Sequence, residues 1–400
     1  MVDELEVAVV GGSLGGLTAA CLLRDAGHRV TVYERSPVPL EERGAGIGLL
    51  SATYRYLVER AGVALDEVSV ATDAIRYLDA DGAVIDDTAH RYLFSSWNTV
   101  YRALMGHWER PGAEAGRYRL DHEMTAFRVD DDGRVQVEFA NGARVGCDLL
   151  IGADGVGSQA RAALLPAVEP AYAGYVAWRG MVPERDLAAD TAGLLGDAIT
   201  YFVYPGSHIL AYPIPSAEGS VAPGDRLVNI VWYRNYTAGD ELTDLLTDAD
   251  GVVRTMSVPP GSMAPRHCQE ARATATSVLP APLAEVVTTA EELFVQVVYD
   301  IEVDRMAFGP VCLLGDAAFA VRPHAAAGTA KAADDGWTLV EALAAEDSLA
   351  AATARWEASQ LDLGRRLLAR TRAIGHRSQV ANDWRIGDPD LIFGLHRPGD

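Results

Sequence analysis

The stretch Leu5-Glu-Val-Ala-Val-Val-Gly-Gly-Ser-Leu-Gly-Gly-Leu-Thr-Ala-Ala-Cys-Leu-Leu-Arg-Asp-Ala-Gly-His-Arg-Val-Thr-Val-Tyr-Glu34 decides the fold of this chain. An apolar run to Val10 predicts a buried strand, a glycine-rich turn follows, and Leu17 to Ala26 has the spacing of a helix. Arg29 to Tyr33 predicts a second strand, which Glu34 ends. This order is typical of a dinucleotide-binding fold, in which glycines admit a pyrophosphate and the acid binds a ribose diol.

The stretch leaves the choice of dinucleotide open. The fingerprint is G-x-S-x-x-G, with Gly11 and Gly16 in the outer positions and Ser13 in the middle one. An acid such as Glu34 suits the ribose of NAD and that of the ADP half of FAD equally well. The next segment, Glu42-Arg-Gly-Ala-Gly-Ile-Gly48, predicts a flexible glycine-rich loop, either beside the nucleotide or simply on the surface.

A second unit of strand, turn and helix lies further along the chain. Val311 to Leu314 predicts a short buried strand, Asp316 follows its end, and a helix is expected to begin near Gly328. A carboxylate in this place can accept hydrogen bonds from a polyol, and the N-terminus of the helix would attract an anion. The alternative is an ordinary turn in which Asp316 is an N-cap.

The intervening segments predict an α/β protein in which strands of a second sheet interrupt the nucleotide domain. Asp81-Gly82 predicts a hairpin, and the turns at Asp132-Gly133 and Asn141-Gly142 predict a small meander. Residues 172–289 contain several strands rich in aromatic residues, for which antiparallel pairing is expected. Such a sheet would form one wall of a cleft for a small molecule.

The composition argues against several classes of partner. The 400 residues carry a formal net charge of −22, whereas nucleic acids and anionic membrane surfaces attract basic patches. No apolar run predicts a membrane span and no signal peptide is recognisable, so a cytoplasmic protein is expected. The four cysteines are widely spaced, and no spacing of histidines or cysteines predicts a metal site.

Three motifs, taken in order, resemble the single-component FAD-dependent aromatic hydroxylases, the para-hydroxybenzoate hydroxylase-like flavoproteins. They are the glycine turn with Glu34, then Gly152-Ala-Asp-Gly-Val-Gly-Ser158 with Arg161, and then Gly315-Asp-Ala-Ala318 with Pro323, Gly328 and Asp335. The resemblance covers nearly the whole chain. It implies an FAD-binding Rossmann-type α/β domain, interrupted by a mostly antiparallel β substrate domain and followed by C-terminal helices.

This resemblance implies a division of the chain and a reaction. The FAD-binding domain would comprise residues 1–72, 100–168 and 293–345, the substrate domain residues 73–99 and 169–292, and the C-terminal helices residues 346–400. NADPH or NADH would reduce FAD, and a flavin C4a-hydroperoxide would then hydroxylate an electron-rich hydroxypyridine or phenolic ring. The expected partners are a small aromatic substrate, dioxygen and NAD(P)H, and a homodimer is expected.

The resemblance also implies which residues hold the cofactor. These are Gly11, Ser13, Leu14, Gly16, Glu34, Arg35, Gly46, Ile47, Arg102, Asp154, Gly155, Asp316, Pro323, Ala326, Ala327 and Gly328. Two of them depart from the family pattern. Ala326 stands in place of a glycine, and Arg102 lies one residue after the position of the usual arginine, where this chain has Tyr101.

The catalytic candidates are His324, Pro323, Tyr212 and Arg179. A phenolate or hydroxypyridine anion is attacked faster than the neutral ring, so a base or hydrogen-bond donor near the substrate hydroxyl should matter. His324 is the first candidate for that role, because Pro323 would lie beside the flavin ring. The alternative is a scaffold histidine that binds backbone groups.

Other functions are compatible with parts of the pattern. A natural-product hydroxylase would act on a larger pyridine, phenol or polyketide ring with the same cofactor. A non-catalytic flavin-binding sensor would keep Glu34 and Asp316 but would need no closed pocket. An NAD-dependent dehydrogenase would explain the N-terminal stretch and leave Asp154 and Asp316 without a role. A flavin-dependent halogenase would have a related fold, but the chain lacks W-x-W-x-I-P.

Overall fold

The computed structural model describes residues 2–41, 45–110 and 117–400. Its first layer is a six-stranded sheet with the strand order β17-β18-β10-β1-β2-β6. The strands are β1 (Glu6–Val10), β2 (Arg29–Tyr33), β6 (Arg117–Arg119), β10 (Leu149–Gly152), β17 (Ala307–Phe308) and β18 (Val311–Leu313). All neighbours are parallel except β17 and β18. The central strands are almost wholly apolar because both faces of the sheet are covered.

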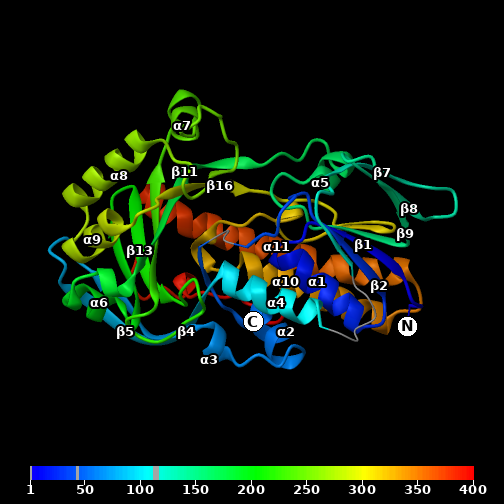
Figure 1. Ribbon diagram of the computed structural model, residues 1–400, viewed down its shortest axis with the longest axis horizontal. Helices are drawn as coiled ribbons and strands as arrows, with labels where there is room; N and C mark the ends of the chain where they lie inside the picture. The colour runs from blue at the N-terminus through cyan, green and yellow to red at the C-terminus, as the bar shows by residue number, and fades with distance from the viewer. Residues whose placement is uncertain (1, 42–44, 111–116) are drawn as a thin grey trace.

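Helices pack on this sheet and on one another. Helix α1 (Leu14–Asp25) follows β1 directly and packs against α4 (Trp97–Trp108) and α10 (Gly328–Ala345). Helices α2 (Ser51–Glu59) and α11 (Leu349–His376) pack against α10 in turn. Figure 1 shows α1 and α10 beside β1 and β2, with α4 and α2 next to them and α11 running across the middle of the molecule. The predicted order of strand, helix and strand between residues 5 and 34 is confirmed.

The second layer is a nine-stranded sheet with the order β15-β16-β11-β14-β13-β12-β4-β5-β3. Its strands are β3 (Gly46–Gly48), β4 (Val70–Leu78), β5 (Val84–Ser96), β11 (Ala171–Pro183), β12 (Ala198–Tyr204), β13 (Ser207–Ile214), β14 (Leu227–Asn235), β15 (Ser257–Val258) and β16 (Phe294–Asp300). Neighbours are antiparallel apart from β12 and β4. Helices α6 (Ala189–Leu195) and α9 (Ala281–Thr289) pack on it, and α8 (Pro265–Val278) packs on α9 (Figure 1).

Two strands of the nine-stranded sheet lie wholly inside segments predicted to belong to the FAD-binding domain. Strand β3 belongs to the nine-stranded sheet, although residues 1–72 were assigned to the FAD-binding domain. Strand β16 also belongs to it, although residues 293–345 were assigned in the same way. The prediction of a flexible loop at Gly46 to Gly48 is wrong, because these residues pair with Phe94 to Ser96 of β5. Residues 42–44 of that predicted loop lie outside the described residues.

Shorter elements complete the fold. The predicted meander is confirmed as β7 (Met124–Val129), β8 (Val135–Phe139) and β9 (Arg144–Cys147), with Gly133 and Gly142 at positive φ in its turns. The remaining helices are α3 (Leu65–Val68), α5 (Gln159–Leu164) and α7 (Asp240–Leu245), with short helical turns η1 (Glu184–Asp186), η2 (Gly315–Ala317), η3 (Pro323–Ala325), η4 (Arg377–Ala381) and η5 (Pro389–Leu391). Within the described residues, no helix has both the length and the apolar character that a membrane span requires.

Candidate functional site

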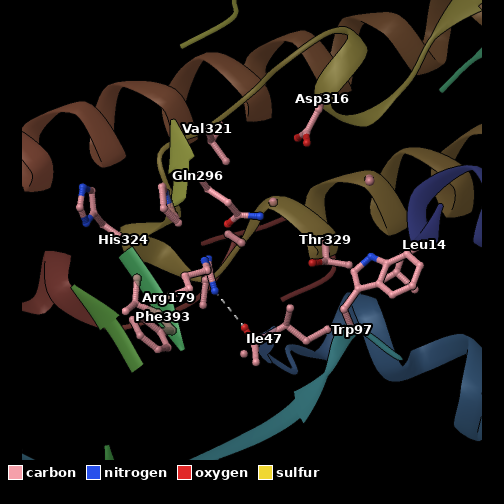
Figure 2. Close-up of a pocket in the computed structure, with 18 of the residues that line it drawn as sticks. Leu14, Ile47, Trp97, Arg179, Gln296, Asp316, Val321, His324, Thr329 and Phe393 are labelled. Carbon is pink, nitrogen blue, oxygen red and sulfur yellow. Dashed lines mark hydrogen bonds between the residues drawn. The ribbon is translucent and has the colours of Figure 1, made fainter. Parts of the chain in front are cut away.

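A cavity of about 360 Å³ lies between the two sheets. The first layer contributes the glycine turn before α1 and the residues before α10, and the second layer contributes β3, β11, β13 and β14. Figure 2 shows Leu14, Trp97 and Thr329 at one end of this cavity and His324 and Phe393 at the other. The cavity therefore joins the predicted nucleotide site to the aromatic strands.

Two helix N-termini open into the cavity. Helix α1 begins after Ser13 and α10 begins after Ala327, and neither N-cap side chain binds the first turn. Residues of both first turns line the cavity. The backbone N–H groups of a first turn have no partner within the helix, and the helix dipole adds positive potential. This end of the cavity is therefore suited to a pyrophosphate or another anionic group.

The glycines of the fingerprint are required by the turn itself. Gly11 has φ +103°, and a Cβ there would lie 2.2 Å from the carbonyl oxygen of Ala153. A Cβ on Gly16 would lie 2.0 Å from the carbonyl oxygen of Gly11. Both distances are far below contact, so the turn could not keep its shape with larger residues. The same absence of side chains leaves backbone exposed to the ligand.

A second cavity of about 250 Å³ adjoins the first, and Ser13, Trp97 and Gly155 line both. It contains the predicted ribose-binding acid. Glu34 is buried and its two carboxylate oxygens accept hydrogen bonds from the backbone N–H groups of Gly12 and Ser36, each at 2.9 Å. A carboxylate oxygen has two lone pairs, so Glu34 keeps acceptor capacity for ribose hydroxyls.

Asp154 supplies an unused acceptor in this second cavity. Its Oδ2 accepts hydrogen bonds from the backbone N–H groups of Gln159 (2.7 Å) and Ala160 (3.1 Å), at the start of α5. Its Oδ1 is buried without a hydrogen-bond partner in the part of the chain that the structure describes. Buried oxygens without partners are rare, so this atom fits a ligand that brings a donor. Together with Glu34 and the glycine turn, it fits the adenosine and pyrophosphate part of FAD.

Arg161, which follows Asp154 in the second motif, has a structural role. It is buried, and its guanidinium donates to the carbonyl oxygens of Val156 (2.6 Å) and Ala317 (3.1 Å). These bonds join the segment after β10 to η2, the turn that carries Asp316. Arg161 therefore links the second motif to the third, and its guanidinium is not directed at the ligand.

Asp316 projects into the large cavity from the end of β18 (Figure 2). Its side chain is exposed to the cavity but surrounded by protein, and this desolvation, with a contribution from Asp335, raises its pKa to about 6. Beneath it, the buried ammonium of Lys331 binds Oδ1 of Asp335, while Oδ2 accepts the N–H of Gly315 at 2.9 Å. The pair thus holds the turn that positions Asp316.

Ala326 occupies a backbone position that favours glycine. Ala326 adopts φ +51°, a left-handed conformation that costs an alanine about 1–2 kcal/mol, whereas the family's glycine adopts it freely. Its methyl group also faces β3, since a Cβ on Gly48 would lie 2.7 Å from it. The cavity wall is therefore closed by Ala326 and Gly48 together.

The other end of the cavity is aromatic. Phe94 and Tyr212 are stacked with their ring centroids 4.1 Å apart, and Tyr233 and His208 are stacked at 4.5 Å. Burial raises the pKa of Tyr212 to about 12, although the neighbouring Arg179 opposes the shift, so the hydroxyl stays protonated. Desolvation lowers the pKa of His208 to about 3, which keeps that ring neutral. Flat aromatic ligands suit such walls.

Arg179 and Gln296 bring polar groups to the middle of the cavity (Figure 2). The guanidinium of Arg179 donates to the carbonyl oxygen of Gly46 at 3.4 Å, and its Nε has no hydrogen-bond partner among the described residues. Within those residues no carboxylate forms an ion pair with it. A guanidinium with free donors in an aromatic cavity is suited to an anionic or strongly polar ligand.

His324 is buried in the cavity wall next to the aromatic cluster. Its Nε2 lies 2.7 Å from the hydroxyl oxygen of Tyr175, and its Nδ1 has no partner among the described residues. Desolvation, with His208 and Arg322, holds its pKa well below the usual range, so the ring is neutral. A neutral imidazole here can exchange hydrogen bonds but resists taking up a proton.

Most of the predicted residues meet in these two cavities. The large cavity is lined by Ser13, Leu14, Gly16, Gly46, Ile47, Gly155, Arg179, Tyr212, Asp316, Pro323, His324, Ala326, Ala327 and Gly328. The second cavity is lined by Gly11, Glu34, Arg35 and Asp154, and again by Ser13 and Gly155. Arg102 lines neither cavity, and its exposed guanidinium donates to the carbonyl oxygen of Ala217 (2.6 Å).

Several lining residues were missed in the sequence. Gln296 is a polar residue within the apolar strand β16, and that break in the pattern could have identified it. Trp97 begins α4 directly after the N-cap Ser96, where a tryptophan looks like ordinary core. His208 and Trp384 reach the cavity only through tertiary packing, and no local signal marks them.

The sequence matches two families of cofactor-binding domains. Residues 4–208 match the FAD binding domain family, and residues 172–300 match the FAD binding domain-like family. The chain is 38% identical to 2,6-dihydroxypyridine 3-monooxygenase from Paenarthrobacter nicotinovorans, over 97% of this chain and 95% of that enzyme. It is 26% identical to 6-hydroxynicotinate 3-monooxygenase from Bordetella bronchiseptica, over 84% and 82% of the two chains.

Solved structures agree with these matches. The structure of 2,6-dihydroxypyridine-3-hydroxylase from Arthrobacter nicotinovorans superposes with a TM-score of 0.91, at 36% identity, over 99% of each chain. Klebsiella pneumoniae HpxO, complexed with FAD and uric acid, shares the fold with a TM-score of 0.75 at 22% identity, over 97% and 90% of the two chains. The cavities and the matches together establish that this chain belongs to the FAD binding domain family and is an FAD-dependent monooxygenase.

Proposed function

We propose that this monooxygenase hydroxylates a small hydroxypyridine ring, with NADPH or NADH as reductant. The observation that carries the proposal is the composition of the substrate end of the cavity, where aromatic walls surround the free donors of Arg179. A hydroxypyridine is flat, electron-rich and easily ionised at its hydroxyl. It would therefore pack between the rings while its oxygen binds the guanidinium.

FAD would supply the redox chemistry, and the protein would bind and orient the cofactor. Bound FAD accepts a hydride from the nicotinamide and activates dioxygen, so that one oxygen atom can be transferred to an electron-rich ring. The glycine turn, Glu34 and Asp154 would hold its adenosine and pyrophosphate, and Asp316 its ribityl side. The N-terminus of α10 would stabilise negative charge on the reduced ring system, because first-turn N–H groups line the cavity there.

Arg179 would favour the ionised form of the substrate. A guanidinium beside a hydroxyl lowers the pKa of that hydroxyl, and the anionic ring is more electron-rich at its carbon atoms. Tyr212, which stays protonated and lies beside Arg179, would donate a second hydrogen bond to the same oxygen. Charge on the ring would thus be held by fixed donors in a site with little water.

His324 would position the ring rather than remove its proton. Its lowered pKa makes the imidazolium unfavourable, which argues against the role of general base expected from the sequence. The hydroxyl of Tyr175, at 2.7 Å, holds one ring nitrogen, and the other remains available for a hydrogen bond. The substrate proton would instead leave before or during binding, since Arg179 already favours the anion.

The relative at 38% identity supports a pyridine ring, although relatives at 28–30% identity are named for 3-amino-4-hydroxybenzoate. Two relatives are named for dihydroxypyridine and hydroxynicotinate, and both are 3-monooxygenases. The experiment is to measure NADPH and NADH oxidation by the purified protein with a panel of hydroxypyridines and phenols, and to identify products by mass spectrometry. The proposal would be supported if only hydroxypyridines stimulate NADPH or NADH oxidation and are hydroxylated. Hydroxylation restricted to phenols would refute it.

We also propose a cytoplasmic homodimer. All four cysteines are free thiols, and Cys21, Cys147 and Cys312 are buried, as expected in a reducing compartment. A symmetric dimer is the commonest assembly of soluble proteins. Light scattering on the purified protein measures the mass directly, and a mass of one chain would refute the dimer.

A further inference from the structure

The C-terminal segment closes the aromatic end of the cavity. After α11 and η4, the chain returns along the second sheet, and Trp384, Leu391 and Phe393 line the same cavity as the catalytic candidates. Figure 2 shows Phe393 beside Arg179 and below His324, at the end remote from Leu14 and Thr329. This segment lies outside both matched family ranges, which end at residues 208 and 300.

Phe393 is built into the aromatic wall. Its ring centroid lies 4.8 Å from that of Tyr92 and 6.4 Å from that of Phe94, and Phe94 stacks on Tyr212. The same ring reaches β3, because a Cβ on Gly48 would lie 3.8 Å from it. Phe393 thus continues a row of rings that begins at Tyr212, beside the proposed substrate oxygen.

Hydrogen bonds hold the C-terminal segment to both sides of the cavity. The N–H of Phe393 donates to the hydroxyl of Tyr92 at 2.9 Å, and the N–H of Gly394 donates to the carbonyl oxygen of Ala325 at 3.2 Å. Ala325 follows His324 directly, so the second bond joins the tail to the turn that holds this histidine. At the N-terminal end of the segment, Trp384 Nε1 donates to the hydroxyl of Tyr77 at 3.4 Å.

Further ion pairs hold the segment from behind. Arg377 binds Asp388 (2.5 Å) and Asp390 (3.2 Å), which lie at the start of η5, the turn that carries Leu391. Arg370 of α11 binds the carbonyl oxygen of Gly394. Side chains on a segment held at so many points are poorly able to move aside for a larger ligand.

We infer that Trp384, Leu391 and Phe393 determine the size of ring that the enzyme accepts. This inference rests on the proposed function, since it assumes that the substrate lies at the aromatic end of the cavity. The tail would form the outer wall against a single six-membered ring and exclude a fused second ring. Specificity would therefore be set by a segment outside the matched FAD-binding domains.

The test compares a single ring with a fused one. Wild type and Phe393→Ala are assayed with 2,6-dihydroxypyridine and with 2,4-dihydroxyquinoline, for product formation and for binding by calorimetry. Removing apolar contacts from a pocket wall changes discrimination by about 10- to 200-fold. Phe393→Ala should therefore raise the ratio of kcat/KM for the quinoline to that for the pyridine at least about tenfold. Its affinity for the quinoline should rise as well.

Matched variants separate the outcomes. Ile386→Ala changes a side chain of the same segment that is 41% exposed and lines no cavity described above, so its ratio should equal that of wild type. Leu391→Ala removes a smaller side chain than Phe393→Ala does, so it provides a second test if Phe393→Ala does not fold. An unchanged ratio in both cavity variants would overturn the inference. Failure of wild type to hydroxylate any hydroxypyridine would instead overturn the proposed function.

Discussion

Replacing Arg179 by methionine should lower kcat/KM for the hydroxypyridine by about 10- to 150-fold. Methionine keeps an unbranched apolar stem of similar length but removes the charge and every donor. Hydrogen bonds to charged groups contribute about 1.5–3 kcal/mol, and each 1.36 kcal/mol is a factor of ten in rate. The guanidinium has donors to spare, since its Nε has no partner among the described residues and its bond to Gly46 is long at 3.4 Å. Most of the lost energy should therefore be energy of substrate binding.

The assay measures kcat and KM separately from initial rates of product formation. If Arg179 binds the anion equally in the ground state and the transition state, its loss should raise KM. If its binding strengthens as charge develops, its loss should lower kcat. Arg179→Lys should recover part of the activity, because the charge returns without the fork of donors. Arg102→Met is the control, since Arg102 binds the Ala217 carbonyl and lies outside the cavities. A kcat/KM for Arg179→Met within about threefold of wild type, at equal flavin content, would refute the role given to Arg179.

Three further changes test other parts of the site. Gly16→Ala should abolish FAD binding, because the new Cβ would lie 2.0 Å from the Gly11 carbonyl oxygen. Flavin absorbance after gel filtration measures this binding, and retained flavin would contradict the account of the turn. Tyr175→Phe removes the hydrogen bond that orients the ring of His324, and the value of one such bond, about 1 kcal/mol, is about fivefold in kcat/KM. Tyr172→Phe on the same strand should leave kcat/KM unchanged. Lys331→Met should destabilise the fold by about 3–5 kcal/mol in urea unfolding, because it leaves the carboxylate of Asp335 buried and unpaired. Burial already raises the pKa of Asp335 against the opposing effect of Lys331, so Asp335 of the folded variant binds a proton more tightly than it does in the unfolded chain. The loss of unfolding free energy relative to wild type should therefore grow from pH 5 to pH 8. A loss that shrinks over this range would contradict the assignment.

The local patterns of the sequence were sufficient for the nucleotide-binding part of the first layer, although they did not predict the short strands β6 and β17. The run to Val10, the glycine turn and Glu34 are contiguous, and a strand buried on both faces has a recognisable apolar run. Asp316 could be predicted for the same reason, because it lies three residues after the end of the short strand β18. In each case the residues that meet in space are also close in sequence.

The rest of the site depends on contacts that no local pattern contains. Gly46 to Gly48 looked like a loop, because three residues with two glycines have little strand propensity, yet pairing with β5 makes them a strand. Arg102 looked like a cofactor ligand because of its place in α4, but the helix orients it toward Ala217. Trp384 reaches the cavity from far along the chain. Such placements follow from tertiary packing, which sequence spacing does not determine.

The central claim is tested most directly by supplying ¹⁸O₂ to the purified protein with FAD, NADPH or NADH, and 2,6-dihydroxypyridine. Mass spectrometry of the product then shows where the oxygen has gone. The account predicts a ring product that carries one ¹⁸O atom and that requires the reductant. Consumption of the reductant without a labelled product, for this and every other hydroxypyridine, would contradict it.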